Sequence, residues 1–287
     1  MKKIMLLALA CLVLTTQAQS NPINDPLQNL AINLVTGEGD NDTETVELRT
    51  YKVKLGNSKG NQVVISMNSS AVEVIGHNSD EVIIQTSNYT PPPQQAEGLK
   101  SLYNQVEDNT QLGLGVTKEN NILRITKASR QGGSYTIRVP KNVSVVYRES
   151  NWNGQNFALA DVDGEIEIKL NNGSATLTNV SGPVVANTTN GTLKIKFTAL
   201  DQNKPSSISS INGNVDITMP ASTKANLNLR SINGEIYTDF DLNLKKEDKS
   251  GLPRIAGGNT IDGKINGGGV DMSVNTINNN IFIRKSK

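Results

Sequence analysis

Four acidic residues alternate along one short stretch of the sequence: Asp161, Asp163, Glu165 and Glu167. Alternate residues of a β-strand share one face, so these carboxylates are expected to lie together on an outer face. Clustered carboxylates bind hard cations such as calcium, and paired carboxylates catalyse glycoside hydrolysis. The competing interpretation is a solvated strand face that resists edge aggregation. We favour it because the acidic run stops before Lys169, and a single linear run lacks converging ligands.

His77 is the only histidine and falls in the turn-like segment 75–80. An imidazole can serve as a general base, but no cysteine nucleophile or serine motif accompanies this one. A single histidine also excludes a zinc cluster with several histidine ligands. We therefore interpret His77 as a turn residue, and we predict no catalytic residue, no metal ligand and no cofactor.

Two further groups could bind sugars. Trp152, with Tyr147 and Phe157 nearby, could stack on sugar rings; we favour the alternative that the three rings cap the end of a repetitive core. Lys194 and Lys196 alternate outward and would suit an anionic polysaccharide, although a solvated face is the simpler interpretation.

The overall composition argues against some classes of function. The 287 residues include 28 basic and 27 acidic side chains, and aromatic residues make up 4%. A net charge near zero argues against nucleic-acid binding, which requires a clustered basic surface. The scarcity of aromatic residues argues against an extended stacking platform.

Residues 1–18 are typical of a secretory signal peptide. Lys2 and Lys3 precede the apolar run 4–14, and Thr16-Gln17-Ala18 resembles a cleavage site. Cys11 lies inside the apolar run without the leucine that a lipobox requires three positions earlier, which disfavours lipidation. The mature chain would contain no cysteine and no apolar stretch long enough for a transmembrane helix. We expect an exported protein of the cell envelope (periplasm or cell surface) or a secreted one.

After the signal peptide, segment 19–45 is polar and predicts a tether, and 46–287 predicts one all-β domain. Within that domain, 46–147 contains short alternating strands with an insertion at 88–120, and 148–287 is a repeat region with a charged loop at 245–259. The insertion contains three consecutive prolines at 91–93. After these prolines, four residues are spaced like one face of a helix and predict a short helix there: Ala96, Leu99, Tyr103 and Val106.

The repeat region carries the clearest structural signal. Turn dipeptides, mostly Asn-Gly, recur every 9 or 10 residues at first and every 21 or 22 later. After Gly191 the apolar residues are Leu193, Ile195 and Phe197, and similar alternation follows the other glycines. An antiparallel β-meander or sandwich would use Asn-Gly as hairpin turns, whereas a β-solenoid or β-helix would use it at corners. The repeated register favours the solenoid, in which equivalent asparagines would form hydrogen-bonded ladders.

The runs 210–220 (SINGNVDITMP) and 229–240 (LRSINGEIYTDF) resemble the bacterial putative-adhesin family, a group of exported domains of unknown function with Asn-Gly β-solenoid repeats. Elements at 98–114 and 135–140 extend the resemblance over about residues 50–287. The resemblance implies a β-solenoid in the cell envelope or at the surface. It implies no activity and no site residues.

Together these observations predict an exported, non-enzymatic, adhesin-like β-solenoid that acts in surface binding or as an envelope scaffold. Its partner is not identified by the sequence; a surface glycan and an envelope protein are the two candidates. The alternative is a polysaccharide-active β-helix enzyme, for which the acidic run from Asp161 is the sole support.

Overall fold

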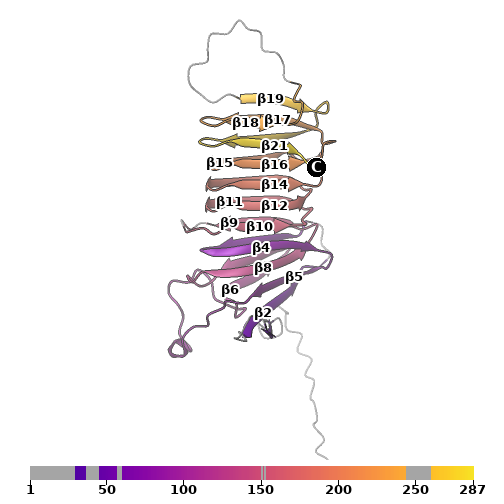
Figure 1. Cartoon of the computed structure of the whole chain (residues 1–287). Coiled ribbons are helices and arrows are strands. Elements are labelled where there is room, and N and C mark those ends of the chain that lie inside the picture. Colours follow the sequence, from indigo (N-terminus) through magenta and orange to yellow (C-terminus); the bar gives the residue numbers. More distant parts are fainter. Residues whose placement is uncertain (1–29, 37–44, 57–59, 150, 152, 244–259) are drawn as a thin grey trace, which may run out of the picture.

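The computed structural model describes residues 30–36, 45–56, 60–149, 151, 153–243 and 260–287. They form a long stack of two β-sheets (Figure 1). The 11-stranded sheet A has the order β1 (Leu30–Thr36), β2 (Thr45–Lys54), β5 (Glu81–Thr86), β8 (Gly133–Pro140), β4 (Ser70–His77), β10 (Phe157–Ala160), β12 (Ala175–Val180), β14 (Leu193–Phe197), β16 (Val215–Met219), β21 (Ile281–Lys285) and β18 (Ile236–Thr238). The 10-stranded sheet B has the order β19 (Thr260–Ile265), β17 (Ala225–Ser231), β20 (Val270–Thr276), β15 (Ser206–Asn212), β13 (Val184–Asn190), β11 (Ile166–Asn172), β9 (Ser144–Glu149), β3 (Gln62–Met67), β7 (Ile122–Lys127) and β6 (Leu114–Glu119).

The repeat region is a parallel β-solenoid, as the repeated register predicts. Each coil contributes one strand to each sheet, and strands of successive coils pair in parallel, as β10, β12, β14 and β16 do. Leu177 pairs with Ile195, which pairs with Ile217, so like residues stack on like. The antiparallel meander is therefore excluded for these coils.

Alternation of side chains builds the core between the sheets. In β14, Leu193, Ile195 and Phe197 are buried, while Lys194 and Lys196 point to solvent. The same pattern recurs in both sheets, and the buried apolar residues form one continuous cluster. A core of this length stabilises the fold without disulfides.

Both ends of the stack are interleaved. At the C-terminal end, β20 and β21 insert between the coil of β15 and β16 and the coil of β17 and β18. At the other end, the coil of β3 and β4 lies between β7–β8 and β9–β10. The N-terminal strands therefore continue the same stack as the repeats.

Antiparallel strands cover three of the four exposed sheet edges. In sheet B, β6 pairs with β7 and β19 pairs with β17. In sheet A, β5 pairs with β8 and leads to β2 and β1. Antiparallel edges of this kind stop a parallel stack from continuing into another molecule.

The predicted tether and helix require correction. Segment 19–45 contains β1, whose residues Leu30, Ile32 and Leu34 alternate with smaller or polar neighbours, as strand residues do. The charged loop at 245–259 and residues 1–18 lie outside the described residues.

Segment 88–120 contains β6 and a single 3₁₀ turn, Gln94–Ala96, but no α-helix. Gly98 has φ +75°, which a right-handed helix does not allow, and Leu99 and Tyr103 are exposed. The spacing thus mimicked a helix face that the backbone does not form. No helix in the described part of the chain is long and apolar enough to cross a membrane.

Candidate binding surfaces

The four acidic residues from Asp161 to Glu167 do not converge. Asp161 and Asp163 lie on the corner between β10 and β11, Glu165 precedes β11, and Glu167 lies in β11. The expectation of a single strand face is therefore wrong for most of the run. The corner forms because Asp161 takes a left-handed conformation (φ 60°), which Asp tolerates better than most residues.

Each acid instead has a partner of its own. Asn179 donates to Asp161 at 3.2 Å and Ser181 to Asp163 at 2.6 Å. Lys204 pairs with Glu165 at 2.8 Å, and Arg148 pairs with Glu167 at 3.4 Å. Among the described residues no acidic, histidine or cysteine group has the geometry of a metal site. The hypothesis of a polysaccharide-active enzyme thus loses the paired carboxylates on which it rested.

His77 is the last residue of β4, directly before the bends at 78–80, so the interpretation as a turn residue is wrong by one position. Its Nε2 lies 2.8 Å from the backbone oxygen of Glu81. This contact links the two ends of the β4–β5 turn. The imidazole therefore has a structural contact.

Tyr147 and Phe157 are core residues. Their rings stack at 3.9 Å between centroids, and both are fully buried. Neither ring caps the end of the core or can reach a sugar, because the stack continues on both sides through β3–β4 and β11–β12. Trp152 lies outside the described residues.

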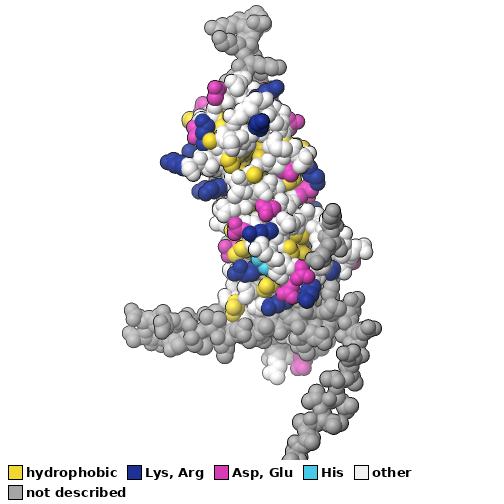
Figure 2. All heavy atoms as spheres, turned by 90° about the vertical axis from the view of Figure 1, so that its right-hand side faces the viewer, with side chains coloured by type: hydrophobic (Ala, Val, Ile, Leu, Met, Phe, Trp, Pro, Cys, Tyr) yellow, Lys and Arg dark blue, Asp and Glu magenta, His cyan; other side chains and the backbone are white. Residues whose placement is uncertain are grey.

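Lys194 and Lys196 do point outward from β14, but the basic strip is one strand wide. Lys194 is flanked by Thr176 on one side and Asp216 on the other, and Lys196 by Thr218 on β16. Figure 2 shows acidic and basic side chains interspersed over one face of the stack. On that face the charge pattern does not favour a strongly charged partner.

A ladder of asparagines runs along one corner of the stack, at the turn dipeptides of the repeats. Side-chain amides join Asn172, Asn190, Asn212, Asn278 and Asn233 in that order, at 2.5, 2.7, 2.6 and 2.8 Å. We call these five residues the asparagine ladder. Its formation confirms the stacking of like residues and leaves a regular row of amide groups on an exposed corner.

Hydroxyl groups hold the same corner from inside. Thr188, Ser210 and Thr276 donate to the backbone oxygens of Gly173, Gly191 and Gly213, respectively. These glycines have no room for a side chain: a Cβ on Gly213 would lie 1.7 Å from the oxygen of Gly191. Thr188 and Ser210 each stand two residues before an Asn-Gly corner, so the hydroxyl, the asparagine and the glycine all help to form these two corners.

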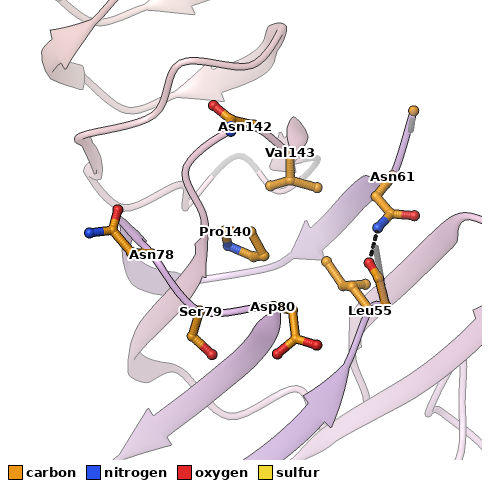
Figure 3. A pocket seen from close by; sticks show the side chains of 10 residues that line it. Leu55, Asn61, Asn78, Ser79, Asp80, Pro140, Asn142 and Val143 are labelled. Carbon is orange, nitrogen blue, oxygen red and sulfur yellow. Dashed lines mark hydrogen bonds between the residues drawn. The ribbon is translucent and has the colours of Figure 1, made fainter. Parts of the chain in front are cut away.

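The site that sequence reasoning missed is an open pocket of about 460 Å³ near the N-terminal end (Figure 3). Leu55, Pro140 and Val143 provide its apolar surface, while Asn61, Asn78, Ser79, Asp80 and Asn142 supply amide, hydroxyl and carboxylate groups. Three chain segments far apart in sequence meet here, so only the topology brings them together. This set of groups can hydrogen-bond a neutral, hydroxyl-rich ligand.

A buried polar cluster fixes segment 108–114 against the end of the stack. Lys127 donates to the Tyr135 hydroxyl at 2.5 Å, and Tyr135 donates to the Leu112 backbone oxygen at 2.8 Å. Burial lowers the pKa of Lys127 to about 8, opposed by the negative charge of Asp108. Burial also raises the pKa of Tyr135, with Asp108 contributing in the same direction.

Glu149 is a second buried ionisable group, in the core beside Tyr147. Its Oε1 accepts a hydrogen bond from the Asn151 amide at 3.0 Å. Burial raises the pKa of this carboxyl, opposed by backbone amides of Asn151, Ser69 and Ser70. It occupies the position that Leu170 takes in the next coil, and it does not reach the pocket's lining.

Most of the repeat region matches a known protein family. Residues 163–284 match the sequence model of the Toastrack DUF4097 family. Among solved structures, the chain is similar to a putative cell adhesion protein from Clostridium sporogenes (10% identity, TM-score 0.45), covering 83% of this chain and 99% of that one. It is also similar to a putative adhesin from Bacteroides fragilis (10% identity, TM-score 0.37, 83% and 97% covered). No curated protein matches it in sequence.

Proposed function

We propose that the chain, whose residues 163–284 match the Toastrack DUF4097 family, is an exported adhesin-like protein without enzymatic activity. It acts in surface binding or as an envelope scaffold. The basic amino-terminal segment and the apolar run 4–14 support export.

The observation that carries this proposal is the continuous two-sheet stack. It presents long, regular outer faces on which the candidate catalytic groups are scattered and individually paired. A rigid rod with repeated polar corners suits binding along its length, because each coil presents equivalent groups at the same spacing. Catalysis, in contrast, requires convergent groups.

The partner we propose is a surface glycan, and the pocket beside Asp80 is its first candidate site. The neutral amides of Asn61, Asn78 and Asn142 suit sugar hydroxyls, and no aromatic ring lines the pocket. An envelope protein is the other candidate, for which the asparagine ladder offers a regular polar corner.

Protease shaving of intact cells tests the location. An epitope-tagged chain at the cell surface is cut by added protease, whereas a periplasmic chain is cut only after the outer barrier is opened. A cytoplasmic control protein must stay intact in both cases. Protection until the envelope is opened would contradict surface binding and leave the scaffold. Retention in the cytoplasm would overturn export itself.

A further inference from the structure

The most exposed large apolar side chains among the described residues gather in one short loop. Leu99 is 73% exposed, Leu102 is 94% exposed and Tyr103 is 72% exposed. The next most exposed large apolar residue, Tyr237, reaches 51%. Isolated exposed apolar residues are ordinary, but three within five residues of one loop indicate an interaction site.

The loop projects from the stack at the end that carries β2 and β6 (Figure 1). Its base is fixed: Asp108 accepts hydrogen bonds from the amides of Thr110 and Gly113, and Asn109 exchanges two with the backbone of Val116. Leu112 and Leu114 beyond the base are fully buried. The apolar tip is therefore held out from a firmly anchored support.

The shape of the tip favours a deformable apolar surface as its partner. It does not favour a β-strand or a partner that fills a groove. Residues 97–106 form turns and bends without a strand, so they present no hydrogen-bonding edge for another β-strand. Arg130 stacks over the Tyr103 ring at 4.3 Å, which places a cation beside the aromatic ring. Leucine tips bordered by tyrosine and a cation are typical of the interface between lipid headgroups and acyl chains.

We propose that this loop, which we call the apolar loop (residues 97–106), inserts its tip into the surface of a lipid bilayer and so docks the stack on a membrane. The proposal rests on the proposed export, which would place the chain beside envelope membranes. Within the apolar loop Glu97 offsets Lys100, so the loop has no net attraction to anionic lipid. Apolar burial is the driving force, and binding is insensitive to salt and to lipid charge.

Vesicle co-sedimentation tests the proposal, with the chain purified after export, its amino terminus determined by mass spectrometry, and phosphatidylcholine vesicles at millimolar lipid. The wild type should bind in both low and high salt. Leu99→Ser with Leu102→Ser should lower the partition coefficient by at least about tenfold, since each buried leucine contributes about that factor. The matched control, Ile211→Ser with Ile232→Ser, removes two partly exposed residues of the stack and should change it less than twofold.

A fluorescent probe locates the contact. The sequence outside the predicted signal peptide has no cysteine, so Leu102→Cys gives a single labelling position for an environment-sensitive dye. The dye emission should shift to the blue on vesicles, while a dye at Ile232→Cys should not respond. Three results would overturn the proposal: no binding of the wild type, equal binding by the double variant, or a loss of self-association in the double variant, which would make the occupant a second copy of this chain. Because purified protein is used, these results are independent of the shaving experiment.

Discussion

In the middle of the stack, from β11 to β16, the same corner residues recur from coil to coil, whereas the N-terminal end closes the stack with antiparallel strands and a buried polar cluster. The middle coils fill equivalent places with equivalent groups, such as Asn172, Asn190 and Asn212. The N-terminal end uses antiparallel strands β6 and β5 and the single cluster around Lys127.

The difference follows from what each region must satisfy. An interior coil needs only to match two neighbours that are like itself, so one solution can be copied along the stack. An end must close an open edge and bury polar groups that no neighbouring coil satisfies. We therefore expect a glycine-to-alanine substitution to lower the free energy of unfolding by very different amounts in the two regions.

Gly213→Ala should have the largest effect. Its Cβ would lie 1.7 Å from the backbone oxygen of Gly191, and backbone in the middle of a stack cannot move aside. We expect a loss of at least about 3 kcal/mol in the free energy of unfolding. The matched change Gly98→Ala, in the apolar loop, meets nothing within 4 Å and is opposed only by the φ of +75°, so it should cost about 1–2 kcal/mol. Urea unfolding measures both; equal losses would show that the interior corner is no more constrained than the loop.

Lys127 should make stability depend on pH at the N-terminal end. Its pKa is lowered to about 8 in the folded chain from an ordinary 10.5, so folding opposes its protonation. The penalty is complete below pH 8 and disappears as the pH rises toward 10.5. The free energy of unfolding should therefore increase by about 2 kcal/mol between pH 8 and 10.

The raised pKa of Tyr135 acts in the opposite direction as the pH approaches and passes 10, the ordinary pKa at which the unfolded tyrosine is half ionised. Lys127→Met removes the titrating amine and should abolish the rise between pH 8 and 10. Urea titrations of the two chains across this window provide the measurement. A rise that persists in Lys127→Met would assign the pH dependence to another group.

The middle coils were largely predictable from the sequence, because equivalent residues of a repeat occupy equivalent positions in successive coils. Turn dipeptides and the alternation after Gly191 predicted both the parallel stacking and the asparagine ladder. The interleaving of β20 and β21 was not predictable. An alternating strand such as Val270–Thr276 fits any parallel neighbour of similar pattern, and only the full packing decides its place.

At the N-terminal end, local sequence patterns suggest structure that the fold does not form. Leu99 and Tyr103 have helical spacing, but Gly98 and the preceding prolines favour turns, and tertiary contacts hold only the base of the loop. Tyr147 and Phe157 are core residues and not the expected end cap, because β3 and β4 continue the stack beyond them. The pocket beside Asp80 depends on three turns whose proximity no sequence spacing encodes.

Breaking the asparagine ladder should have a moderate effect. Asn212 both donates to Asn190 and accepts from Asn278, so Asn212→Ala removes two hydrogen bonds on an exposed corner. We expect a loss of about 1 kcal/mol in the free energy of unfolding, since the exposed partners can bond to water instead. Ser207→Ala, on the exposed face of the same strand, should cost less than half as much. If Asn212→Ala lowered the free energy of unfolding no more than Ser207→Ala does, the ladder would not contribute to stability.

The smallest effect is expected at Asp163. Its carboxylate is exposed and accepts one hydrogen bond from Ser181, so Asp163→Ala should change the free energy of unfolding by less than about 0.5 kcal/mol. Adding calcium should not alter the melting temperature of either chain, because the neighbouring acids bind other partners and do not converge. If calcium instead raised the melting temperature of the wild type and not of Asp163→Ala, the acidic corner would be a cation site. The middle coils would then not be purely structural, because one of them would carry a binding site as the N-terminal end does.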